Sequence, residues 1–157
     1  MNAVTTAQPP QAGYEQDFHA WTRQQAECVR ARQFGMLDID HLAEEIEFMG
    51  GEVLNAIGSY VRQILVHLTL LRYAPAAEPR AQWSDEIGNC RAEIEQRLER
   101  SPSLQPRMAG IVQAEWNRAC RLARRKLARD GVVDLPAECP FTLAQVLDYD
   151  YVPDQGT

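Results

Sequence analysis

The sequence lacks the long apolar run that a membrane-spanning helix requires. Its most apolar stretch, residues 64–71, is interrupted by His67 and Thr69 and bounded by Arg62 and Arg72. This stretch is too short and too polar to cross a bilayer. The first 13 residues contain no basic segment followed by an apolar core, so we expect no signal peptide. These two absences predict a cytoplasmic protein with no membrane partner.

The spacing of the cysteines fits no metal or redox motif. The four cysteines are Cys28, Cys90, Cys120 and Cys139, and no two of them form a C-x-x-C pair. In a reducing compartment they are expected to stay free thiols. The first three fall within helical patterns and are predicted to pack as small hydrophobic residues. Their spacing does not match a structural zinc site.

Familiar catalytic signatures are also missing. The chain has no glycine-rich dinucleotide fingerprint, no phosphate-binding loop, no nucleophile elbow and no H-E-x-x-H zinc motif. The Glu-x-x-His pair of di-iron helical bundles is absent as well. We therefore predict no cofactor, with a bound metal ion kept as an alternative.

What the sequence does contain is helical periodicity. The 157 residues, 45% hydrophobic and 24% charged, match one ordinary globular domain. Apolar residues recur every three to four positions, and no alternating strand pattern occurs. The pattern predicts an all-α helical bundle of about four main helices, the second one long, over roughly residues 14–32, 39–73, 83–100 and 106–131.

A short fifth helix is expected near the C-terminus. Thr142 followed by Gln145 forms a capping box, and Phe141 and Val146 occupy the positions of a hydrophobic staple. The predicted domain covers residues 14–153, between a disordered tail over residues 1–13 and a short tail over 154–157. The second helix contains Gly50-Gly51, where we expect a bend; because its apolar stripe stays in register, we predict that the helix continues.

Four short motifs resemble one known family. They are Y-E-Q-D-F-H-A-W at residues 14–21, L-A-E-E-I-E at 42–47, S-P-S-L at 101–104 and E-C-P-F-T-L at 138–143. In this order they resemble the bacterial family catalogued as domain of unknown function 29 (DUF29), over residues 14–153. The resemblance implies a small bacterial helical protein and implies no activity, ligand or catalytic residue. Gly50-Gly51 departs from the charged helical residues that relatives usually have there.

The first candidate polar site is an acidic cluster at the start of the second helix, formed by Glu44, Glu45 and Glu47. His41 and Glu45 are one helical turn apart, a spacing at which both side chains can bind one metal ion. Carboxylates in the first turns of a helix are also favoured by its macrodipole. The cluster is therefore interpreted mainly as stabilising the start of the helix, with metal binding as the alternative.

His67 and Glu115 are predicted to lie on apolar helix faces. A lone histidine on such a face is usually a core residue with one hydrogen bond, but it can also act as a ligand or general base. A buried carboxylate such as Glu115 must be paired or protonated. If the second and fourth helices pack together, Glu45, His67 and Glu115 could converge into a site. The alternative partner for Glu115 is an arginine.

The fourth helix carries a run of basic residues with no acidic residue among them. The run consists of Arg118, Arg121, Arg124, Arg125, Lys126 and Arg129. We interpret it mainly as a solvated face near a helix C-terminus, where cations are favoured. An acidic protein is the next alternative. Nucleic acid is the weakest, because the net charge is -6 and no aromatic residues interleave with the charges.

The sequence predicts no specific function. We favour a protein that acts through an interaction surface, with a protein partner or as a homo-oligomer, and helix three has a narrow apolar stripe with charged flanks that suits helix pairing. The alternative is a metal-binding or enzymatic bundle centred on His67, with Glu45 and Glu115. Nucleic-acid binding through the basic face is a third hypothesis.

Overall fold

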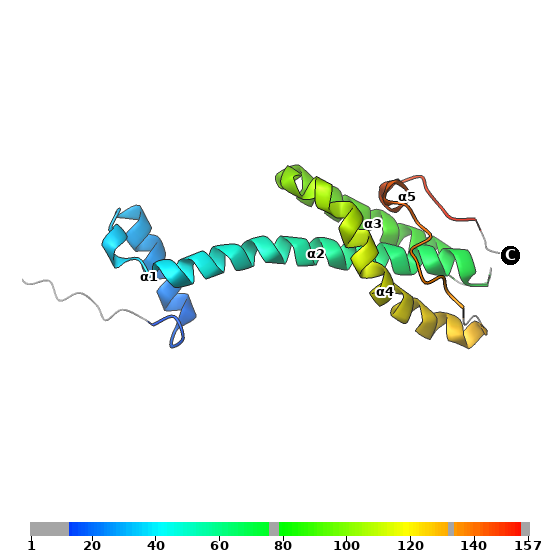
Figure 1. The fold of residues 1–157 in the computed structure, drawn as a ribbon, viewed down its shortest axis with the longest axis horizontal. Coiled ribbons are helices and arrows are strands. Elements are labelled where there is room, and N and C mark those ends of the chain that lie inside the picture. The colour runs from blue at the N-terminus through cyan, green and yellow to red at the C-terminus, as the bar shows by residue number, and fades with distance from the viewer. Residues whose placement is uncertain (1–12, 76–78, 132–133, 155–157) are drawn as a thin grey trace, which may run out of the picture. The chain divides into compact units, whose positions relative to one another are not determined.

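A computed structural model describes residues 13–75, 79–131 and 134–154. Within these residues the secondary structure is helical, and no strand is present. The predicted all-α bundle with a long second helix is therefore confirmed (Figure 1). The predicted tail over residues 1–13 lies, apart from Gly13, outside the described residues. The chain divides into two compact units, residues 1–50 and 51–157, which we describe separately. The prediction of one domain over residues 14–153 stays a prediction.

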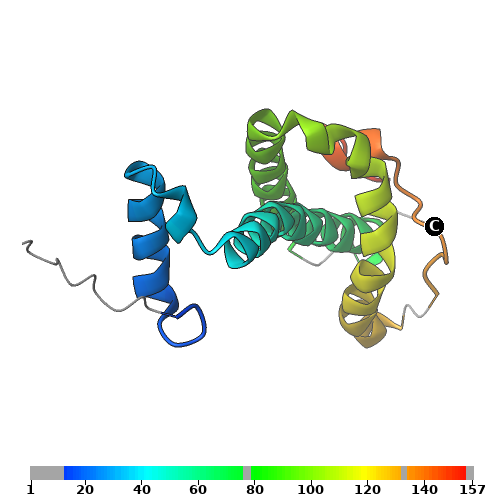
Figure 2. The ribbon, with the colours of Figure 1, turned by 60° about the vertical axis from the view of Figure 1, so that its left-hand side comes forward.

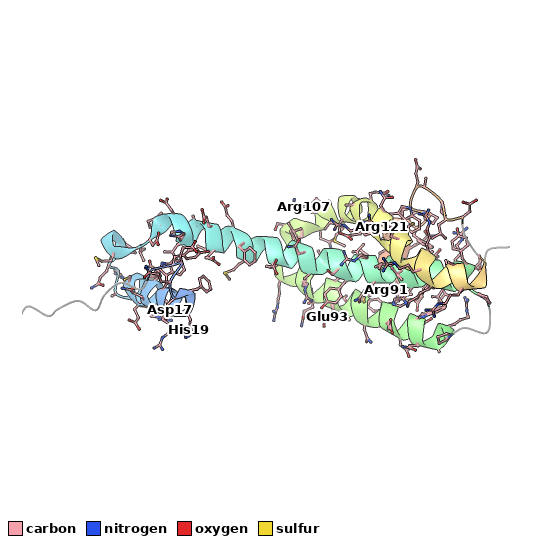
Figure 3. All side chains as sticks on the ribbon, turned by 90° about the horizontal axis from the view of Figure 1, so that it is seen from below. Asp17, His19, Arg91, Glu93, Arg107 and Arg121 are labelled. Carbon is pink, nitrogen blue, oxygen red and sulfur yellow. The ribbon has the colours of Figure 1, made fainter. Side chains whose placement is uncertain are left out.

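The first unit contains helix α1, Phe18–Arg30. The Asp17 carboxylate accepts a hydrogen bond from the Ala20 amide and so caps the start of the helix. Asp17 and His19 lie at this start (Figure 3). At the other end Arg32 adopts a left-handed conformation with φ of 57°, and the Gln33 amide donates to the Cys28 carbonyl. This is the Schellman arrangement, which ends α1 sharply.

Helix α2 spans Ile39–Tyr73 without interruption. A 3-10 turn, Phe34–Met36, connects α1 to it. The predicted range and the predicted continuity through Gly50-Gly51 are both confirmed. Ala74 and Pro75 follow its last turn, and Pro75 ends the helical pattern because a residue before proline disfavours the helical conformation. The boundary between the two units falls within this helix.

The second unit packs α3, Arg80–Arg100, and α4, Met108–Leu127, against residues 51–73 of α2. Figures 1 and 2 both show these three helices side by side. A 3-10 segment, Pro102–Arg107, joins α3 to α4, and another, Ala128–Asp130, follows α4. The core between the helices includes the fully buried residues Ile64, Leu68, Ile94, Met108 and Leu127. Trp83 and Trp116 are buried in the same core.

Helix α5, Leu143–Leu147, has the N-terminus that the sequence predicts. The Thr142 side chain accepts from the Gln145 amide, and the Gln145 side chain accepts from the Thr142 amide, which completes the capping box. Phe141 and Val146 are both buried in the core of the second unit. The helix lies against α3 through Arg91, whose guanidinium donates to the carbonyls of Gln145 and Val146.

Candidate functional site

Exposed apolar side chains are concentrated in the first unit. Of the ten large hydrophobic residues that are exposed in the described part of the chain, seven lie within residues 18–49. Several of them line a groove of about 580 Å³ between α1 and the first turns of α2, which we call the apolar groove. Its apolar lining residues are Phe18, Trp21, Ala26, Val29, Leu42, Ile46, Phe48 and Met49.

The apolar stripe of α2 is exposed where it borders this groove. Ile46 and Met49 continue the stripe into the first unit. In the structure Ile46 is 67% and Met49 is 68% exposed. The stripe is buried only from Ile57 onward, where α3 and α4 pack on it. Among the described residues of the first unit, α1 is the α-helix that faces this part of α2, and one short helix covers only part of the stripe.

A cluster of aromatic and polar side chains holds the two walls of the groove together. Asp38 is its centre: its carboxylate accepts from Trp21 Nε1 at 3.2 Å and contacts His41 Nδ1 at 2.8 Å. The Asp38 amide donates to Gln25 Oε1, a buried side chain of α1. These contacts fix the start of α2 against the middle of α1. The two helices that form the groove are therefore fixed against each other, although the side chains at its rim are exposed.

Tyr14 occupies the space between His41 and Glu45. Its ring stacks on the His41 ring with centroids 4.2 Å apart, and its hydroxyl donates to Glu45 Oε1 at 2.5 Å. The hydrogen bond to Glu45 raises the pKa of Tyr14 to about 12. The hydrogen bond to Asp38 raises the pKa of His41 and lowers that of Asp38. His41 and Glu45 thus each have a different side-chain partner, and a metal ion bound by both stays a prediction.

His67 lies in the second unit and is 7% exposed. Its Nε2 contacts Glu86 Oε2 of α3 at 2.6 Å, while its Nδ1 is buried with no hydrogen-bond partner. Burial lowers the pKa of His67. The nearby Glu86 acts to raise this pKa, and Lys126 acts to lower it further. Glu86 is the partner of His67 that sequence analysis missed, because it lies on an ordinary charged helix face, where no pattern marks it.

Glu115 is 7% exposed and forms the arginine pair that the sequence left as an alternative. One carboxylate oxygen accepts from Arg62 of α2 at 3.0 Å, and the other accepts from Arg118 at 2.8 Å. His67 has Glu86 as its partner, and it lines a different cavity from Glu115. Glu45 belongs to the first unit. His67 and Glu115 thus have different partners, and a site that Glu45 shares with them stays a prediction.

The basic run of α4 is exposed along its length but does not form one uniform surface. Arg118 is paired with Glu115. Lys126 and Arg129 line the cavity that contains His67. Arg121, Arg124 and Arg125 remain as exposed cations, and Figure 3 shows Arg121 on α4. Nucleic-acid binding by this run stays a prediction.

Three of the four thiols have raised pKa values. Burial raises the pKa of Cys90 to about 11 and also raises the pKa values of Cys120 and Cys139, so these thiols stay protonated near neutral pH. In the described ranges, no three His, Cys, Asp or Glu side chains gather into a group that could hold a metal ion.

The stripe of helix three does not provide the docking surface that its pattern suggested. Trp83, Ile87, Cys90, Ile94 and Leu98 are all buried in the core of the second unit. The exposed large apolar side chains of the described residues are concentrated in the first unit, and several of them line the apolar groove. Phe48 was the sequence signal for it, because this residue is apolar although it lies off the main stripe of α2.

Comparison with known proteins identifies one similarity. The family model described as domain of unknown function DUF29 matches residues 14–152. No curated protein and no solved structure matches the chain. Among the described helices, none has both the length and the apolar character to span a membrane.

Proposed function

This chain belongs to the family of domain of unknown function DUF29, and from its surface we propose that it is an interaction protein whose apolar groove binds a basic amphipathic helix of another protein. The single observation that carries the proposal is the concentration of exposed apolar side chains at residues 18–49. Contiguous exposed apolar surface of this kind marks interaction sites in soluble proteins.

The form of the groove fits a helix. Its walls are two helices, and its rim residues Phe18, Ile46, Phe48 and Met49 are between 49% and 68% exposed. An amphipathic helix docks by placing apolar side chains at i, i+3, i+4 and i+7 into such a groove. Phe48 and Met49 would contact these side chains, and methionine adapts well to differing partners.

The charge of the first unit decides which kind of helix fits. Residues 13–50 carry three arginines and eight carboxylates, a net side-chain charge of −5 out of −6 for the whole chain. The carboxylates are Glu15, Asp17, Glu27, Asp38, Asp40, Glu44, Glu45 and Glu47. Pairing two copies through the same groove would bring these acidic surfaces together, whereas a basic helix would be attracted to them.

The proposal is tested with the full chain and two designed peptides. Both peptides are 20-residue amphipathic helices with the same leucine face, one with lysine and one with glutamate on its polar face. Fluorescence anisotropy should show that the lysine peptide binds and that binding weakens as salt is added. The glutamate peptide should bind at least about tenfold more weakly, which corresponds to ~1.4 kcal/mol.

Two variants that each introduce an aspartate test whether the peptide binds in the groove. Met49→Asp should remove most of the affinity for the lysine peptide, because it puts a charge on the apolar wall. Phe34→Asp is the control, since Phe34 is 64% exposed in the same unit but does not line the groove. Equal loss in both variants, equal binding of both peptides, or self-association that Met49→Asp abolishes would each overturn the proposal.

A further inference from the structure

A second cavity lies in the other unit, between the ends of three helices. It has a volume of about 360 Å³, within the range of small-molecule sites. α2 contributes His67, α3 contributes Gln82 and Glu86, and the end of α4 contributes Lys126 with Arg129 just beyond it. We call this space the His67 cavity. Its lining is rich in charged and polar side chains, unlike that of the apolar groove.

The start of α3 adds positive potential to the His67 cavity. Pro79 occupies the N-cap position, lines the cavity and provides no side-chain cap. The first backbone amides of a helix have no acceptor within it, and the helix dipole places partial positive charge at this end. A helix N-terminus of this kind attracts an anion. In addition, Nη1 of the adjacent Arg80 is buried without a hydrogen-bond partner.

Two side-chain cations also add positive potential to the His67 cavity. Lys126 and Arg129 line the cavity, and neither is in an ion pair among the described residues. The carboxylate in the lining is Glu86, and it already contacts His67 Nε2. The cavity therefore has an excess of positive charge that no described side chain neutralises.

His67 adds a second feature to the cavity, an unpaired hydrogen-bond acceptor, which is independent of the positive charge. With Nε2 held 2.6 Å from the Glu86 carboxylate, the imidazole proton lies on Nε2, so the neutral ring presents a bare lone pair at Nδ1. This nitrogen is buried and has no partner, in a side chain that is more than nine-tenths buried and lines the cavity. An unpaired buried acceptor is costly, and a ligand that donates a proton to it would remove this cost.

We propose that the His67 cavity binds a small oxyanion that also carries a hydrogen-bond donor, such as hydrogen phosphate or a hydroxyl-bearing phosphate or carboxylate compound. The anionic oxygens contact Lys126, Arg129 and the first amides of α3, while the hydroxyl donates to His67 Nδ1. The site is separate from the apolar groove and does not depend on the proposed helix partner.

The test compares hydrogen phosphate with sulfate, at constant ionic strength and pH 7.5. Both are tetrahedral dianions, but at this pH only phosphate keeps a proton that it can donate. NMR of histidine-labelled full-length protein should show saturable shifts of the His67 resonances, with those of His19 and His41 unchanged. Phosphate should bind about tenfold more tightly than sulfate, the effect of one hydrogen bond to a charged ligand.

Three variants complete the test. Lys126→Ala should weaken phosphate binding, and His67→Phe, followed through the Gln82 side-chain amide, should remove the preference for phosphate over sulfate. Arg121→Ala is the matched control, because Arg121 is exposed on the same helix and does not line the cavity. Equal affinity for the two anions, or equal loss in Lys126→Ala and Arg121→Ala, would overturn the proposal.

Discussion

At the scale of single residues, His67 combines burial with a paired and an unpaired nitrogen. Its neighbours act in opposite directions: Glu86 of α3 favours the protonated ring, and Lys126 of α4 disfavours it. Desolvation is the largest effect, so the pKa of His67 lies below its usual value of about 6.5. The neutral form therefore dominates in the folded protein at neutral pH.

This direction predicts how stability responds to acid. As the pH falls below about 6.5, the unfolded chain takes up a proton at position 67 more readily than the folded chain does. The contribution of His67 to the free energy of unfolding is thus present above this pH and is lost as the pH falls. Urea unfolding at steps between about pH 7.5 and 5.5 measures how much of the free energy of unfolding is lost as the pH falls, which we call the acid loss. The acid loss should be smaller for His67→Phe than for the unchanged protein.

His41 provides a control with the opposite sign. Asp38 raises the pKa of His41, so its contribution to stability is present at low pH and is lost as the pH rises through the folded value. His41→Phe should therefore enlarge the acid loss. If both variants changed the acid loss in the same direction, the assignment for His67 would be wrong.

At the scale of elements, α5 depends on a residue outside itself. A helix of five residues is far too short to be stable alone. Its last carbonyls, which lack partners within the helix, accept from Arg91 at 2.9 and 3.0 Å. Arg91 is 4% exposed, and burial lowers its pKa, with Asp148 acting in the opposite direction. A buried guanidinium thus attaches α5 to α3.

We predict that Arg91→Met lowers the free energy of unfolding by about 2–3 kcal/mol, because hydrogen bonds from a charged group to buried carbonyls are lost. Urea unfolding measures the loss, and hydrogen exchange should show faster exchange at the α5 amides. Arg100→Met is the control, since Arg100 is exposed at the end of the same helix. A change below about 0.5 kcal/mol, as expected for a surface site, would contradict this role.

The elements also show how far the sequence can predict this structure. The range of α2 follows from its apolar stripe, and the start of α5 follows from the capping box, because both signals are local. His67, Arg91 and Glu115 each have a partner on another helix, at a sequence separation between 19 and 55 residues. A periodic pattern fixes which face a residue occupies, but not which residue faces it.

The apolar groove illustrates the same limit in another form. The stripe of α2 is equally apolar at Ile46 and at Ile57, yet Ile46 is 67% exposed and Ile57 is fully buried. The difference lies in how many helices pack on each half of α2. That number is a property of the tertiary structure, so the location of the candidate binding surface was not predictable from periodicity alone.

At the scale of the whole molecule, the two units share a single element, α2, and their boundary falls at Gly50–Gly51. Glycine in a helix interior costs about 1 kcal/mol relative to alanine. Both glycines are helical here, and a Cβ added at either position would meet no described atom within 4 Å beyond its chain neighbours and the local helix backbone. Nothing in the packing therefore requires glycine at this boundary.

Because α2 is helical through both glycines, Gly50→Ala together with Gly51→Ala should raise the free energy of unfolding by about 1–2 kcal/mol and slow hydrogen exchange of the neighbouring amides. Gly58→Ala is the matched control. It offers the same gain in helix propensity, but its Cβ would lie 3.3 Å from Glu115 Oε1, so crowding should offset the gain. A double variant that loses stability while Gly58→Ala does not would show that the chain at Gly50–Gly51 leaves the helical conformation, and that the two units are joined by a hinge.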